Sequence, residues 1–241
     1  MEKKGKIELT KKIMKYNDQE LNQLSYNLAL KYDMRSYCEY YISLLKTKHN
    51  FFFSFCNNDD YNSKIIKINL FFISYAIYYT VNALFFNDAT MHKLYEDGGK
   101  FNFIYQLPQI LYSAIISGII NVIIKTFALS SGVIIGLKKE KNVDEIKNKE
   151  KKVLNKLRIK FILFFILAFI LLITFWFYIT CFCGVYINTK LHLIKDTIFS
   201  FVLSLIYPFG IYLIPGLLRI HALNAKDKTC IYKLSSLLQM L

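Results

Sequence analysis

Four blocks of apolar residues constrain the fold of this chain more than any other feature of its sequence. A helix needs about 20 mostly apolar residues to cross the ~30 Å of hydrocarbon in a bilayer. The blocks occupy residues 65–86, 108–129, 161–183 and 197–218. The third block contains no charged residue at all. We therefore predict four transmembrane helices at these positions.

The fourth block contains helix-breaking residues. Pro208 has no amide hydrogen and would crowd the carbonyl group of Ser204, four residues earlier. Gly210 and Pro215 follow within the same block. The spacing predicts a bend in the helix near residue 207 and a helix end soon after Pro215.

The composition supports a membrane protein rather than a soluble domain. Hydrophobic residues make up 54% of the chain and charged residues 20%. Because the apolar residues are concentrated in blocks, the predicted fold class is an all-α integral membrane bundle whose main partner is the lipid bilayer. The sequence does not indicate which membrane.

The positive charges predict the orientation of the bundle. Residues 1–64 contain eleven Lys and Arg, residues 130–160 contain ten, and residues 219–241 contain four. Residues 87–107 and 184–196 contain only two each. Basic segments stay on the cytoplasmic side of a membrane, so this alternation predicts that both termini are cytoplasmic.

This orientation divides the chain into three segments. Residues 1–64 form a cytoplasmic segment, residues 65–223 the bundle, and residues 224–241 a short cytoplasmic tail. In the first segment, Asn17 and Glu20 have the spacing of a capping box. An amphipathic helical hairpin is therefore expected before the bundle, bound at the membrane interface or packed on the bundle's cytoplasmic face.

Residues 138–160 are highly charged and are expected to run as a helix into the third span. One interpretation is a solvated extension that follows the charge rule. The other is a polybasic patch for anionic lipid, since each basic residue near such a surface contributes ~1 kcal/mol. Nucleic acid is not an expected partner, because no recognition motif accompanies the charge.

Seven polar residues in the first two spans recur at intervals of four. They are Ser74, Tyr78 and Asn82 in the first span, and Ser113, Ser117, Asn121 and Lys125 in the second. This spacing places each set on one face of a helix, which should point away from lipid. Two hypotheses remain: a polar path for an ion or small solute, with Lys125 setting its charge preference, or polar packing between helices.

No catalytic or cofactor-binding motif is present. Asp88, His92 and Glu96 would share a helix face and could offer metal ligands, but Gly98 and Gly99 follow at once and a solvated loop is the better interpretation. We expect a non-enzymatic protein without cofactor or metal, an anchoring or assembly module that acts alone or as a homo- or hetero-oligomer. The alternative is a subunit of a channel or transporter.

A resemblance is carried by two long stretches, YYTVNALFFNDATMHKLYEDGGKFNFIYQLPQILYS (residues 78–113) and CFCGVYINTKLHLIKDTIFSFVLSLIYPFGIYLIPGLLRI (residues 181–220). They resemble the C-terminal multi-span membrane module of large protist transmembrane proteins that have no assigned activity. The resemblance extends over residues 20–223, with Lys190 and His221 standing where Gln and Pro are expected. It implies a four-span unit and transfers no functional residue.

The predicted orientation can be tested with inserted tags. Tags near Gly99 and Asn188 should be reachable from the exterior or lumenal side, because the segments around them contain few basic residues. A tag after Met1 should be protected in intact vesicles. Labelling of the Met1 tag from the exterior side would contradict the orientation.

Overall fold

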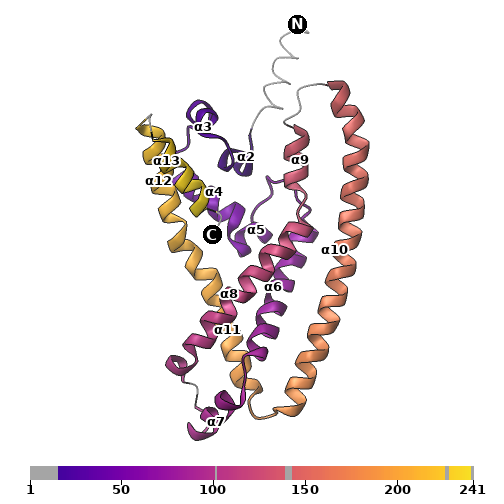
Figure 1. The fold of residues 1–241 in the computed structure, drawn as a ribbon, viewed down its shortest axis with the longest axis vertical. Helices are drawn as coiled ribbons and strands as arrows, with labels where there is room; N and C mark the ends of the chain where they lie inside the picture. The colour runs from indigo at the N-terminus through magenta and orange to yellow at the C-terminus, as the bar shows by residue number, and fades with distance from the viewer. Residues whose placement is uncertain (1–15, 101, 139–142, 226–227, 240–241) are drawn as a thin grey trace. The chain divides into compact units, whose positions relative to one another are not determined.

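The computed structural model describes residues 16–100, 102–138, 143–225 and 228–239, with backbone alone for 143–148. All regular secondary structure in these ranges is helical, which confirms the all-α fold class (Figure 1). Parts of the predicted N-terminal segment, basic segment and tail lie outside the described residues. Contacts divide the chain into two compact units. We call residues 61–207 the span unit, and residues 1–60 with 208–241 the terminal unit.

Four helices are long and apolar enough to cross a membrane, as predicted. The first is α6 (Lys64–Leu84) and the second is α8 (Phe103–Ala128). The third is α10 (Val143–Val185), which includes most of the basic segment without interruption. The fourth combines α11 (Lys190–Ile211) with α12 (Leu213–Asn224).

The fourth helix differs from the prediction. Pro208 lies inside α11, and the helix is interrupted at Tyr212 instead. The Tyr212 amide still donates to the Pro208 carbonyl at a distance of 3.0 Å. The helix does not end after Pro215, so that prediction is wrong. Because α12 restarts at residue 213, Pro215 falls in a first turn, where amide groups have no helical partner and proline is tolerated.

The core of the span unit lies between α6, α8 and α10. Its buried apolar residues are Ile66, Leu70, Ile73, Ile77, Val81, Ile124, Ala128, Phe164 and Ala168. Most of them belong to α6, whose apolar side chains recur at helical spacing and face the two neighbouring helices. By contrast, only 11% of the apolar part of α10 is buried. This long helix therefore presents most of its apolar surface outward.

Short elements join these helices. The helix α7 (Asp88–Glu96) follows α6, and Asn87 caps it by accepting from the Thr90 amide. Gly98 and Gly99 adopt positive φ angles of 59° and 74°, and the Gly99 amide donates to the Leu94 carbonyl. These glycines end α7 in the way expected from the sequence.

The helix α9 (Ser131–Lys138) begins directly after α8. The side-chain oxygen of Asn62 accepts from the amides of Ser130 and Ser131 at 2.9 and 3.0 Å. The Lys160 amino group donates to the Leu129 carbonyl at 2.7 Å. These bonds satisfy backbone groups that the turn between α8 and α9 would otherwise leave open.

The described part of the terminal unit joins both ends of the chain. Its N-terminal helices are α2 (Asp18–Asn22), α3 (Tyr26–Tyr32), α4 (Tyr37–Lys48) and α5 (Asn50–Phe55). The predicted capping box is confirmed, since Asn17 and Glu20 exchange side-chain-to-backbone bonds of 2.8 Å. The predicted hairpin is instead a series of four short helices, because the chain also turns at residues 23–25 and 49.

The C-terminal residues, predicted as a short tail, include a helix that packs on the rest of the terminal unit. The helix α13 (Thr229–Leu238) packs on α12, and the Ser235 hydroxyl donates to the Pro215 carbonyl at 2.7 Å. A Cβ atom added at Gly216 would lie 2.8 Å from the Tyr37 ring, so α12 and α4 approach closely there. The Tyr232 hydroxyl donates to the Leu24 carbonyl at 2.7 Å.

A buried ion pair links the two ends of the chain. Arg219 on α12 has no exposed surface and donates to the Asp33 carboxylate at 2.8 and 3.1 Å. It also donates to the Leu21 carbonyl at 2.8 Å. Its guanidinium lies over the rings of Tyr40 and Tyr232, with centroid distances of 4.9 and 4.7 Å. The buried charge is thus both paired and hydrogen-bonded.

Asp33 is shared between two arginines. Arg35 also donates to its carboxylate, with the Nε–Oδ1 distance at 2.7 Å. Burial raises the pKa of the Asp33 carboxyl, but hydrogen bonds and charges from Arg35 and Arg219 outweigh burial and hold this pKa below its ordinary value. The carboxylate is therefore charged throughout the neutral pH range.

Replacing Asp33 with Asn should lower the free energy of unfolding of the terminal unit by about 3 kcal/mol, because Arg219 would remain buried without its counter-charge. A folded-state pKa below the unfolded one stabilises the protein above the unfolded pKa, and this contribution disappears as pH falls through the folded pKa. The variant and wild type should therefore differ most near neutral pH and converge in acid. Thermal unfolding of detergent-purified protein across pH measures this.

Asp59→Asn provides the control, since Asp59 is exposed on the surface of the same unit. It should leave the unfolding midpoint unchanged. Equal effects of the two substitutions at neutral pH would show that the Asp33–Arg219 pair has no special role.

Candidate functional site

The polar residues singled out in the sequence lie inside the span unit. Ser74, Tyr78 and Asn82 are buried on α6, and Ser113, Ser117 and Asn121 are buried on α8. Lys125, in the last turn of α8, is partly exposed. The structure adds further buried or half-buried polar residues on α8 and α11: Gln106, Gln109, Asp196, Thr197 and Ser200. We call the two sets together, without Lys125, the polar seam.

Asn82 is the centre of the polar seam. Its side-chain nitrogen donates to the Tyr78 carbonyl at 2.8 Å and to the Ser200 hydroxyl at 2.7 Å. Its side-chain oxygen accepts from the Ser113 hydroxyl at 2.8 Å. One buried amide thereby connects α6, α8 and α11, and both of its polar atoms have partners.

The two hydroxyl groups around Asn82 are anchored in their own helices. The single hydroxyl hydrogen of Ser113 is shared between Asn82 and the Ile110 carbonyl, 2.9 Å away, and the Ser200 hydroxyl donates to the Thr197 carbonyl at 3.1 Å. Such bonds fix the side-chain rotamers that meet Asn82. This part of the polar seam is a closed network, which suits helix association more directly than passage of a solute.

The polar seam is different one turn nearer the helix starts. The Gln109 amide nitrogen donates to Asp196 Oδ2 at 3.3 Å. The other carboxylate oxygen, Oδ1, is buried and accepts no hydrogen bond in the described structure. Both polar side-chain atoms of Gln106 are likewise buried without a hydrogen-bond partner there. This end of the polar seam is therefore incompletely satisfied.

Sequence reasoning missed Asp196 and Gln106 because they precede the predicted starts of their spans, and it missed Gln109 because that residue is only the second of its span. A signal was nevertheless present. Asp196 precedes Ser200 by four residues, and Gln106 and Gln109 continue the face of Ser113 at helical spacing. Extending the face of the fourth span back by one turn would have found Asp196, and extending that of the second span back by two turns would have found Gln109 and Gln106.

The discounted metal ligands lie on α7. His92 Nε2 lies 3.2 Å from Glu96 Oε1, and both side chains are exposed. Among the described residues, no group of three His, Cys, Asp or Glu side chains is arranged to hold a metal ion. The paired residues form a surface ion pair when His92 is protonated, a contact that contributes little stability in water.

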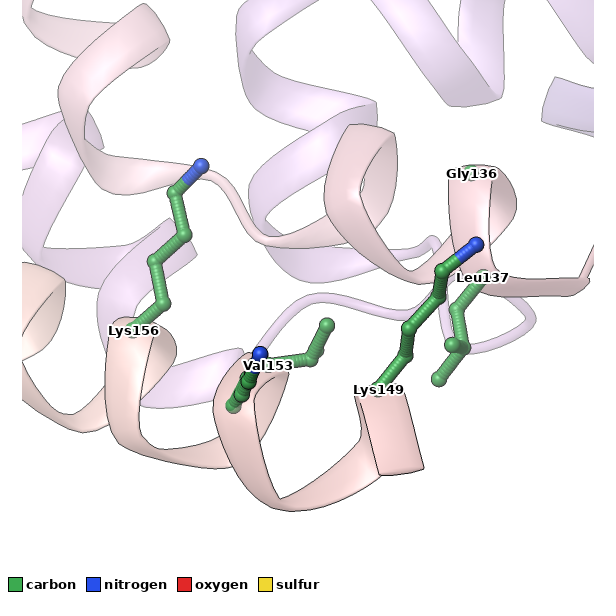
Figure 2. Close-up of a pocket in the computed structure, with 6 residues that line it drawn as sticks. Gly136, Leu137, Lys149, Val153 and Lys156 are labelled. Atoms are coloured by element: carbon green, nitrogen blue, oxygen red, sulfur yellow. The ribbon is translucent and has the colours of Figure 1, made fainter. Parts of the chain in front are cut away.

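A lysine-lined hollow lies between α9 and the start of α10. Its volume is about 280 Å³, and its lining residues are Gly136, Leu137, Lys149, Lys152, Val153 and Lys156. Figure 2 shows Lys149 and Lys156 extending from successive parts of α10 toward the same side. The hollow combines clustered positive charge with the apolar side chains of Leu137 and Val153. That combination matches a phosphate group attached to an apolar body.

Comparison of this chain with protein families, with characterised proteins and with solved structures finds no match. The fold and the arrangement of side chains are therefore the basis for any functional inference.

Replacing Asn82 with Leu should weaken the span unit by roughly 2 kcal/mol, since three intramembrane bonds at ~0.6 kcal/mol each are lost. The matched control is Asn121→Leu on α8. Asn121 is also buried, but its side chain makes no hydrogen bond in the described structure. Unfolding in mixed micelles compares the two variants. Equal destabilisation would mean that the Asn82 network does not hold the three helices together.

Proposed function

We propose that this chain is a non-enzymatic, multi-pass membrane module that anchors or assembles a larger structure. The observation that carries this proposal is the character of α10. One unbroken helix combines an outward apolar surface with a lysine-lined hollow at its start. The helix therefore offers the bilayer an apolar surface and a cluster of positive charge.

The outward face of α10 is large and continuous. Its exposed apolar side chains include Ile162, Leu163, Ile166, Phe169, Ile170, Ile173, Trp176 and Phe177. Such a face fits acyl chains or an apolar helix from another subunit. The proposal therefore includes homo- or hetero-oligomers.

The hollow is the proposed contact for anionic lipid. With both termini cytoplasmic, it would lie at the cytoplasmic leaflet, where anionic headgroups are concentrated. No ion pair in the described structure includes Lys152 or Lys156. Their charges therefore remain available to a headgroup phosphate.

The second candidate function is a channel or transporter subunit. The observation in its favour is the incompletely satisfied end of the polar seam around Asp196. Buried ionisable groups within membrane helices frequently mark ion pathways. The closed network at Asn82 argues against a continuous path, because each of its polar atoms already has a protein partner.

Replacing Lys149, Lys152 and Lys156 together with Gln should weaken binding to anionic lipid by roughly 100-fold, because each basic residue contributes ~1 kcal/mol. Lipid that co-purifies with the protein, and exchange of a labelled anionic lipid in nanodiscs, measure the effect. A variant with Lys93, Lys100 and Lys190 changed to Gln removes the same charge from the predicted exterior side. It should retain the lipid.

Flux in reconstituted vesicles separates the two candidate functions. An anchoring module should leave ion permeability at the level of protein-free vesicles. A selective flux that Asp196→Asn abolishes would instead support the transport subunit. Equal lipid loss in both lysine variants would show that general charge, and not the hollow, retains the lipid.

A further inference from the structure

Asp196 is a buried carboxyl group inside the span unit without a compensating charge among the described side chains. The residue has no exposed surface. Among the described residues, its carboxylate accepts a single hydrogen bond, from Gln109 at 3.3 Å, which is long for a charge-assisted hydrogen bond. No ion pair in the described structure includes Asp196. Nothing among the described side chains therefore offsets one negative charge.

Burial of an uncompensated carboxylate is strongly unfavourable. Transfer of an isolated ionised group into a low-dielectric interior costs many kcal/mol in simple continuum terms, so such groups are paired or neutralised. Elsewhere in this chain the rule is followed, since buried Arg219 is matched by Asp33. Asp196 has an open oxygen atom where a compensating positive charge could bind.

Gln106 provides a second, independent indication of a bound group. Its side chain is 1% exposed, yet neither its amide oxygen nor its amide nitrogen has a hydrogen-bond partner in the described structure. Gln106 precedes Gln109 by three residues on α8, so both lie on adjacent turns of one helix face. Two buried side chains from α8 and α11 thus have unsatisfied polar atoms in the same end of the polar seam.

We propose that Asp196 is neutralised by a bound monovalent cation, an alkali metal ion or a proton, held at its Oδ1 atom with Gln106 and Gln109 beside it. The charge selects this class of ligand, because one cation of charge +1 balances one carboxylate. A divalent ion would leave excess positive charge, and hard divalent cations prefer several carboxylates. The described residues contain no group of three His, Cys, Asp or Glu to supply them.

The other titratable groups on this part of α11 are His192, one turn before Asp196, and Lys195, the residue directly before it. His192 is buried, and Lys195 is exposed. From α8, Gln109 contacts Asp196 and Gln106 lies about one turn earlier on the same helix, and both side chains are uncharged. The cation is thus the group that balances Asp196. This inference is independent of the proposed function, since a bound cation could stabilise a packed bundle or accompany a transported solute.

The test uses the full chain purified in detergent. Thermal unfolding is compared in choline, Na⁺ and K⁺ salts of equal ionic strength at mildly alkaline pH. If an alkali metal ion is the ligand, the midpoint should rise by roughly 3–5 °C for each tenfold increase in that ion above its dissociation constant. If a proton is the ligand, the infrared difference spectrum of wild type minus Asp196→Asn should contain the carbonyl band of a neutral carboxylic acid.

Asp196→Asn mimics the neutral side chain at nearly the same volume. It should remove the salt-specific midpoint shift or the infrared band, and its stability should no longer depend on the cation. Asp88→Asn, an exposed substitution on α7, should behave as wild type. Should Asp196→Asn fail to fold, wild type alone still decides, by the salt series and by its carboxyl absorption. A wild-type protein with no salt-specific shift and only an ionised carboxylate band would overturn the proposal.

Discussion

Hydrocarbon offers no hydrogen-bond partners, and this single constraint governs the whole span unit. Backbone groups must be satisfied within helices, and polar side chains must find partners inside the bundle. Asn82 shows the result most clearly, because its amide bonds to side chains or backbone on α6, α8 and α11. The association of α11 with its neighbours thus depends on a few directional bonds. The aromatic contacts of Phe201 with Phe71, Tyr75 and Tyr78 supplement these bonds.

In the terminal unit, a buried pair of charged side chains finds its partners inside the protein, as the amide of Asn82 does in the span unit. Arg219 and Asp33 are separated by 186 residues in the chain, yet they meet in a buried ion pair. Removing either partner alone would leave a buried charge, which is far less favourable than losing both. The pair therefore couples the N-terminal helices to α12 and α13 more specifically than apolar contact could. The rings of Tyr40 and Tyr232, over which the guanidinium lies, add cation–π contacts to the pair.

Local features of this fold could be predicted from the sequence, while long-range partners could not. The capping box at Asn17, the helix end before Gly98 and the continuous α10 all depend on residues close together in the chain. The burial of the polar residues on α6 and α8 also follows, because spacing of four places them on one face of each helix. The partner of Arg219 was not predictable, since no local pattern points to Asp33. The effect of Pro215 was not predictable because it depends on where the helix restarts, at Leu213.

The two ends of the polar seam differ in how completely their polar atoms are hydrogen-bonded, and this difference indicates which end could bind a ligand. Around Asn82 every polar side-chain atom of the central amide is satisfied, so this part has no free capacity for a ligand. Around Asp196 one carboxylate oxygen and a complete glutamine amide are unsatisfied. A partly satisfied buried network is less stable than an apolar core of the same volume. Helix packing alone would favour apolar residues at the positions of Gln106 and Asp196. The presence of a buried carboxyl group there is therefore best explained by a ligand that completes the hydrogen-bond network.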